Sequence, residues 1–327
     1  MAGPIGCVAA VTYRCNARCT VCDIWKSESR ADDELEPSAY SWLPRTLRSI
    51  NVSGGEPFLR DDLVEIVAVM KQACPRARVV ISTNGLSPDR IERMMSEMKD
   101  VAVRVSIDAV GKGHDEIRGI PGGYERAMDT VTRLKALGVA DLGLAATLSE
   151  RNPGELRKVS GVADDLGIEF ISSAAHSSPI FFGDHDDDRP SSDAAAEEIA
   201  EIMRRNLGSG RPRDWAKAYY MRGLIDYVRG RPRRLPCGAG VDHFFLDPSG
   251  DVYPCNISGV KMGNIRDGSF EQLRANSASE VEPAVAGCEE QCWMVCTVSP
   301  PMRRRPLGPC AWIAGAKLMG LDTSVGR

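Results

Sequence analysis

The sequence predicts an α/β protein: a partial, TIM-like (β/α)6 barrel followed by a small cysteine-rich domain. Its first half alternates short runs rich in β-branched residues with segments of helical period, an order typical of a parallel sheet. Polar and cysteine motifs follow several of the predicted strands, where barrels of this kind place their active sites. Cysteines then return in number after residue 235.

Six strand units account for the barrel, which we predict over residues 1–190. The predicted strands are Cys7–Thr12, Ser49–Ser53, Arg78–Thr83, Val101–Ile107, Leu142–Leu148 and Ile168–Ser172. The helical segments between them are Asp61–Gln72, Pro88–Met98, Tyr124–Leu137 and Pro153–Leu166.

The sequence of residues 174–234 is typical of a connection between two domains. Residues 174–193 contain an acidic run at 184–188 and read as a solvated loop or lid. Two helices, Ala194–Asn206 and Arg213–Tyr227, then form a predicted helical bridge over residues 191–234. The cysteine-rich domain is expected over residues 235–327.

Composition narrows the class of protein. The 327-residue chain has a net charge of -4 and a pI of about 5.7, which argues against a general nucleic-acid binder. It contains no apolar run of the roughly 18 residues that span a bilayer, and its N-terminus lacks a basic signal-peptide region. Eleven cysteines without an export signal favour a reducing compartment, so we expect a cytoplasmic protein.

Cys15, Cys19 and Cys22 form a Cys-x-x-x-Cys-x-x-Cys run at the end of the first predicted strand. Three thiolates at this spacing hold an iron–sulfur cluster with one iron left open for another ligand. Zinc would need a fourth ligand, and none lies nearby in the sequence. A disulfide framework is disfavoured by the odd number of cysteines.

This spacing resembles that of the radical S-adenosylmethionine (SAM) superfamily. The resemblance implies a [4Fe-4S] cluster whose open iron binds SAM and whose electron cleaves it to a 5′-deoxyadenosyl radical. It also implies an electron donor such as flavodoxin or ferredoxin.

The strand-end motifs extend the resemblance. Residues 54–57 read GGEP after the second predicted strand, residues 82–85 read STNG after the third, and residues 106–119 read SIDAVGKGHDEIRG after the fourth. Turn formation, helix capping and a salt bridge between Arg118 and Asp115 are the structural alternatives. The resemblance implies SAM contacts from Gly54, Gly55, Glu56, Pro57, Ser82, Asn84, Ser106, Asp108 and Arg118.

The C-terminal cysteines are Cys237, Cys255, Cys288, Cys292, Cys296 and Cys310. The first two flank a predicted β-hairpin in a spacing that resembles the opening of SPASM and twitch domains. The three cysteines between 288 and 296 are four residues apart, so a helix would align them on one face.

We therefore expect at least one auxiliary [4Fe-4S] cluster, held by Cys237, Cys255 and two of the next three cysteines. Two clusters, or zinc, are the alternatives at these residues. A spare thiol such as Cys310 or Cys288 is a candidate hydrogen-atom donor to a substrate radical.

The main functional expectation is a tailoring enzyme of antibiotic biosynthesis. It would abstract a hydrogen atom from a small carbohydrate-, aminocyclitol- or nucleoside-like metabolite, giving epimerisation, decarboxylation or dehydrogenation. Because the cysteine motif begins at residue 15, we expect no leader-binding domain before it. The alternative is therefore a SPASM peptide maturase that modifies a ribosomal peptide with the help of a separate leader-binding partner. A non-enzymatic iron–sulfur scaffold is the distant alternative. We expect a small-molecule substrate, no membrane association and no nucleic-acid partner.

Overall fold

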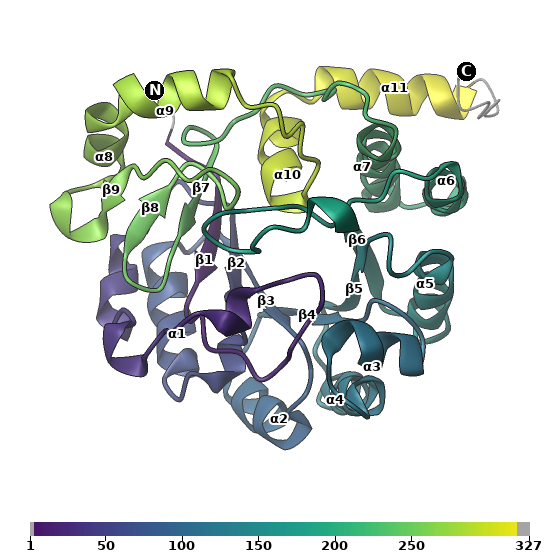
Figure 1. The fold of residues 1–327 in the computed structure, drawn as a ribbon, viewed down its shortest axis with the longest axis horizontal. Coiled ribbons are helices and arrows are strands. Elements are labelled where there is room, and N and C mark those ends of the chain that lie inside the picture. Colours follow the sequence, from purple (N-terminus) through teal and green to yellow (C-terminus); the bar gives the residue numbers. More distant parts are fainter. Residues whose placement is uncertain (1–2, 319–327) are drawn as a thin grey trace.

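The computed structural model describes residues 3–318, which form one nine-stranded sheet with helices around it (Figure 1). The strands run in the order β6-β5-β4-β3-β2-β1-β7-β8-β9. Their bounds are β1 Gly6–Ala10, β2 Ser49–Ser53, β3 Arg78–Thr83, β4 Ala102–Ser106, β5 Leu142–Leu148, β6 Glu169–Ala174, β7 His243–Leu246, β8 Asp251–Tyr253 and β9 Gly263–Asn264.

Strands β1 to β6 form the predicted partial barrel. Each pairs in parallel with the next, as the strand–helix alternation requires. The barrel helices are α1 Leu63–Ala73, α2 Pro88–Glu97, α3 Lys112–Arg118, α4 Gly123–Ala136 and α5 Glu155–Asp165. The later helices are α6 Asp193–Gly208, α7 Pro212–Val228, α8 Phe270–Asn276, α9 Ala278–Ala286, α10 Val295–Arg304 and α11 Leu307–Leu318.

Strand β7 joins the C-terminal part of the chain to the barrel sheet. It pairs in parallel with β1, with Gly6 opposite His243, and then forms the predicted antiparallel hairpin with β8. Helix α10 packs against both β1 and β7, and a Cβ on Gly6 in β1 would lie 2.8 Å from Pro300 Cγ. The cysteine-rich segment is therefore packed directly on the edge of the barrel.

The single helix predicted for the cysteines between 288 and 296 is wrong. Residues 288–294 have no regular structure, and α10 begins only at Val295. Two local features explain the break: Gln291 has a φ of 46°, and the Cys292 carbonyl accepts a hydrogen bond from Arg233 at 2.5 Å. The three cysteines consequently do not share one helix face.

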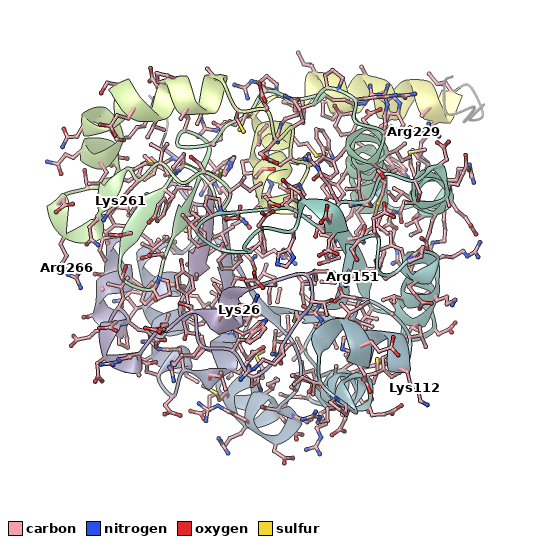
Figure 2. The ribbon with its side chains drawn as sticks, viewed as in Figure 1. Lys26, Lys112, Arg151, Arg229, Lys261 and Arg266 are labelled. Atoms are coloured by element: carbon pink, nitrogen blue, oxygen red, sulfur yellow. The ribbon has the colours of Figure 1, made fainter. Side chains whose placement is uncertain are left out.

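The acidic segment after β6 is solvated in part, because Asp184, Asp186 and Asp187 are exposed as predicted while other residues of the segment are buried. Phe181 is buried and packs on Phe245, with the two ring centroids 5.3 Å apart. Asp188, at the end of the acidic run, is also buried. It forms an ion pair at 2.5 Å with Arg151, which is labelled in Figure 2. This segment covers part of the barrel mouth with aromatic rings and is not a free loop.

Within residues 3–318, none of the helices combines the length and the apolar character needed to cross a membrane.

Candidate functional site

A cavity of about 390 Å³ lies inside the barrel and is lined by residues from both ends of the strands, including the carboxyl ends of β1 to β4. Most of the residues predicted to bind the cluster and SAM line it, although they come from four different strand ends and from α3. Those residues are Cys15, Cys19, Cys22, Gly54, Gly55, Ser82, Asn84, Ser106, Asp108 and Arg118. Glu56 and Pro57 are buried beside the cavity and are not part of its lining.

The thiols of the cysteine loop face hydrogen-bond donors. The backbone N–H of Ala17 donates to Cys15 Sγ at 3.4 Å, and the Asn84 amide donates to the same sulfur at 3.9 Å. Arg118 Nη1 donates to Cys19 Sγ at 3.8 Å. Donors and positive charge around sulfur stabilise anionic thiolates, so these surroundings fit an iron–sulfur cluster.

Burial of these thiols makes them dependent on a bound metal for ionisation. It raises the pKa of Cys15 to about 11 and that of Cys22 to about 12. Bound iron supplies the charge that keeps such thiols ionised at neutral pH. Within residues 3–318, no three cysteine, histidine or acidic side chains converge on a site for a single ion.

Gly54 and Gly55 are required by the cysteine loop itself. Gly54 has a φ of 142°, and a Cβ there would lie 2.1 Å from the Thr12 carbonyl oxygen. A Cβ on Gly55 would lie 2.2 Å from the Arg14 carbonyl oxygen. The Gly55 N–H donates to Thr12 at 2.8 Å, so the two glycines fix the position of the backbone just before Cys15.

Glu56 links two loops of the barrel mouth through hydrogen bonds. It is buried, and its carboxylate accepts hydrogen bonds from Phe58 N at 3.1 Å, Thr83 Oγ1 at 2.8 Å and Asn84 N at 2.7 Å. Burial raises its pKa to about 7, against the opposing effect of these hydrogen bonds. The carboxylate thereby holds the end of β3, and with it Asn84, beside the cysteine loop.

Arg118 pairs with Asp108 and not with Asp115. Its Nη2 lies 2.7 Å from Asp108 Oδ2, and Asp108 Oδ1 accepts a hydrogen bond from Thr147 N at 2.8 Å. Asp115 instead accepts hydrogen bonds from two backbone N–H groups at the start of α4, those of Gly122 and Tyr124, each at 2.7 Å. The pair places one positive and one negative group in the wall of the cavity.

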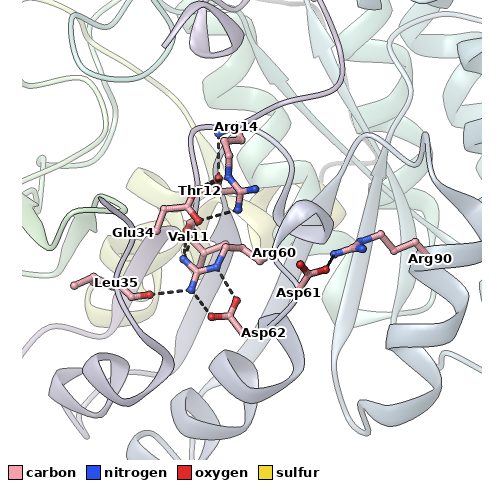
Figure 3. A network of polar contacts seen from close by, with 9 residues as sticks. All are labelled: Val11, Thr12, Arg14, Glu34, Leu35, Arg60, Asp61, Asp62 and Arg90. Carbon is pink, nitrogen blue, oxygen red and sulfur yellow. Dashed lines mark hydrogen bonds and ion pairs between the residues drawn. The ribbon is translucent and has the colours of Figure 1, made fainter. Parts of the chain in front are cut away.

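A buried ionic network behind the cysteine loop has no signature in the sequence (Figure 3). The carboxylate of Glu34, with 1% of its side chain exposed, pairs with Arg14 at 2.9 Å and with Arg60 at 3.1 Å. Arg60 also donates to the carbonyls of Val11 and Leu35. Because Arg14 directly precedes Cys15, the network anchors the cysteine loop to the first barrel strand.

His176 is a cavity residue that the sequence analysis missed. It is 4% exposed, and its Nδ1 donates to the Ala174 carbonyl at 2.7 Å. Its ring stacks on Tyr227 at 4.7 Å, and burial lowers its pKa to about 4. The neutral ring therefore carries a bare Nε2, which has no hydrogen-bond partner among residues 3–318. A substrate N–H or O–H group is a suitable partner for this acceptor.

Four of the six C-terminal cysteines line one of two cavities, and Cys255 and Cys310 line neither. Cys237, Cys288 and Cys292 line a second cavity of about 780 Å³, beside α9. Cys255 packs with Cys292 in a small apolar cluster, and Cys296 packs there too while also lining the barrel cavity. Of the two suggested hydrogen-atom donors, Cys288 lines only the second cavity and Cys310 is exposed on α11, outside both linings.

Comparison with family models gives two matches. Residues 10–156 match the radical SAM superfamily, and residues 237–297 match SPASM, an iron–sulfur cluster-binding domain.

Several characterised proteins are similar along most of the chain. Pre-heme d1 synthase of Dinoroseobacter shibae is 27% identical over 80% of this chain and 71% of its own. The sporulation killing factor maturation protein SkfB of Bacillus subtilis is 25% identical over 83% of this chain and 64% of its own. The PqqA peptide cyclase of Rhizobium meliloti is 26% identical over 85% of this chain and 73% of its own.

Solved structures share the fold. A structure of anSMEcpe with bound AdoMet superposes with a TM-score of 0.64 at 14% identity, covering 97% of this chain and 98% of that one. Streptococcus suis SuiB bound to the precursor peptide SuiA gives a TM-score of 0.61 at 15% identity, over 88% and 67% of the two chains.

Proposed function

Because the chain belongs to the radical SAM superfamily and carries a SPASM domain, we propose that it is an enzyme that modifies a ribosomally made peptide. Its radical SAM domain binds a [4Fe-4S] cluster and SAM, and the SPASM domain indicates auxiliary iron–sulfur clusters. When bound, SAM and its cluster supply a 5′-deoxyadenosyl radical that abstracts a hydrogen atom.

The names of the relatives support a peptide substrate. SkfB is a maturation protein and the PqqA enzyme a peptide cyclase, and each is similar over more than four-fifths of this chain. This favours the alternative expectation of a peptide maturase over a carbohydrate, aminocyclitol or nucleoside substrate. Pre-heme d1 synthase makes a tetrapyrrole the second candidate substrate.

The residues around the barrel cavity would divide the work as follows. Cys15, Cys19 and Cys22 would hold the cluster, while Glu56 keeps Asn84 beside them. The Arg118–Asp108 pair would face the carboxylate and ammonium groups of SAM.

On the substrate side, the rings of Phe181 and Phe182 line the cavity and would exclude water from it. His176 would accept a hydrogen bond from the substrate. The eleven free thiols suit a reducing cytoplasm with a flavodoxin or ferredoxin as electron donor.

Isotope transfer tests the substrate class. The reconstituted enzyme is incubated anaerobically with SAM, dithionite and a short precursor peptide encoded beside its gene, carrying deuterium on its side chains and Cα positions. The proposal predicts deuterium in 5′-deoxyadenosine and a mass change in the peptide. Transfer from a deuterated porphyrin or aminoglycoside, with none from the peptide, would instead identify one of the other substrate classes.

A further inference from the structure

Arg233 makes an unusual set of contacts beside the C-terminal cysteines. Its Nη1 donates to the Cys292 carbonyl at 2.5 Å and contacts Cys292 Sγ at 3.6 Å. Its Nη2 donates to the Thr297 carbonyl at 2.6 Å, and its Nε donates to the Leu235 carbonyl at 2.8 Å. The guanidinium carbon lies 5.5 Å from the ring centroid of Trp293. The group is thus held rigidly over the cysteine segment.

Within residues 3–318, no carboxylate lies within ion-pair distance of Arg233. The neighbouring Arg234 pairs with Asp226, and Arg118, the arginine of the barrel cavity, pairs with Asp108. Both of those positive charges are balanced by an adjacent carboxylate. Within residues 3–318, Cys292 is the one ionisable side chain that hydrogen-bonds to Arg233, so its thiolate is the group that could balance this charge.

Three cysteines line the same cavity as Arg233, together with other side chains such as Arg234 and Glu282. Arg233, Cys237, Cys288 and Cys292 line the same cavity of about 780 Å³. Thr297 adds a hydroxyl 3.7 Å from Cys292 Sγ. A fixed positive charge and hydrogen bonds to ligand sulfur stabilise the more negative, reduced form of an iron–sulfur cluster and raise its reduction potential.

We propose that Arg233 is a positioning residue that raises the reduction potential of the auxiliary cluster, so that this cluster accepts electrons more readily than the SAM cluster. The SAM cluster faces Arg118, whose charge is balanced by Asp108, and it receives less of this stabilisation. The inference rests on the auxiliary cluster of the SPASM domain and not on the choice of a peptide substrate.

The test uses the full-length chain carrying Cys15→Ala, Cys19→Ala and Cys22→Ala, so that only auxiliary iron remains. Three further variants are compared in this background: Arg233→Gln, Arg233→Lys and Arg266→Gln. Arg266 is exposed, donates to the Ser249 carbonyl and does not line the cavity of the cysteines, so Arg266→Gln removes the same charge from another site (Figure 2 labels Arg266). Each protein is reconstituted, its iron is counted, and its cluster is titrated with dithionite and followed by electron paramagnetic resonance.

Arg233→Gln should shift the ratio of oxidised to reduced cluster at least tenfold towards the oxidised form, which is about 59 mV for one electron. Arg233→Lys should stay within threefold of the parent protein, and Arg266→Gln should match it.

Two results would overturn the proposal. One is an unchanged reduction potential in Arg233→Gln with full iron content, and the other is an equal loss of iron from Arg233→Gln and Arg233→Lys. No substrate enters this experiment, so its failure would leave the peptide assay unaffected.

Discussion

The indole of Trp293 lies directly on the bare backbone of Gly223 in α7, where a Cβ would come within 2.0 Å of two ring carbons. Trp293 Nε1 donates to the Tyr220 carbonyl at 2.7 Å, and the Tyr220 hydroxyl donates back to the Trp293 carbonyl at 3.0 Å. The same hydroxyl lies 2.9 Å from the Ser172 carbonyl in β6. Trp293 therefore fixes the segment that carries Cys292 and Cys296 against the barrel.

This contact predicts that Gly223→Ala is destabilising. The added methyl group would overlap a fully buried ring, and overpacking of this kind costs about 1–3 kcal/mol. Gly161, in the middle of α5, is the control, because a Cβ there meets nothing within 4 Å. Alanine at 161 should stabilise the helix by up to about 1 kcal/mol. Urea unfolding measures both, and equal effects of the two substitutions would contradict the packing account.

Breaking the Arg118–Asp108 pair by removing one partner should be strongly destabilising. Asp108 has 1% of its side chain exposed, so Arg118→Gln would leave a buried carboxylate uncompensated, at a cost of about 3–5 kcal/mol. Adding Asp108→Asn should recover part of the loss, since it removes the stranded charge. The control is Arg133→Gln, which breaks only exposed ion pairs and should change the unfolding midpoint little. Equal midpoints for Arg118→Gln and Arg133→Gln would count against a structural role for the pair.

The buried imidazole of His243 should make the stability of the fold fall in acid. Burial, helped by nearby Arg233, lowers its pKa to about 3, whereas an unfolded histidine titrates near 6.5. Above about pH 6.5 the residue is neutral in both states and contributes no pH dependence. Between about pH 6.5 and 3 only the unfolded chain binds the proton, so stability falls as the pH falls, by up to about 1.4 kcal/mol per pH unit.

Urea unfolding at pH 7, 6 and 5 checks this expectation. His243→Leu should give a shallower loss of stability below pH 6.5 than the unsubstituted protein. Parallel pH profiles for the two proteins would show that another group controls the acid response.

The two cavities predict which C-terminal cysteines carry iron. Cys292 lies among the other cysteines, whereas Cys310 is exposed on α11. Cys310→Ala should keep all of its auxiliary iron, and Cys292→Ala should lose one cluster, about four irons per chain. Iron and sulfide analysis after anaerobic reconstitution gives the answer. Iron loss in the Cys310 variant would require a rearranged C-terminus.

The barrel was largely predictable from the sequence, because its signals are local. Strand β2, for example, has the predicted bounds, Ser49–Ser53, and the strand-end motifs of β2 to β4 gather at one cavity. The C-terminal region depends on contacts distant in sequence, such as the pairing of β7 with β1, and these leave no local pattern. The helix expected across Cys288, Cys292 and Cys296 does not form, because Arg233 donates a hydrogen bond to the Cys292 carbonyl, which such a helix would use.

Residues whose role depends on burial also could not be recognised from the sequence. His176 and Glu34 are single polar residues in unremarkable surroundings, and only their exclusion from water marks them out. The division of the chain at residues 190 and 234 and the metal ligands themselves stay predictions.

Cleavage of SAM by the reconstituted protein tests the central claim most directly. The protein is supplied anaerobically with SAM and dithionite, and 5′-deoxyadenosine is measured beside the variant in which Cys15, Cys19 and Cys22 are all alanine. We predict 5′-deoxyadenosine from the unsubstituted protein and none from the variant, with a difference of about four irons per chain. Equal iron and equal 5′-deoxyadenosine in the two proteins would contradict a radical SAM cluster at this loop.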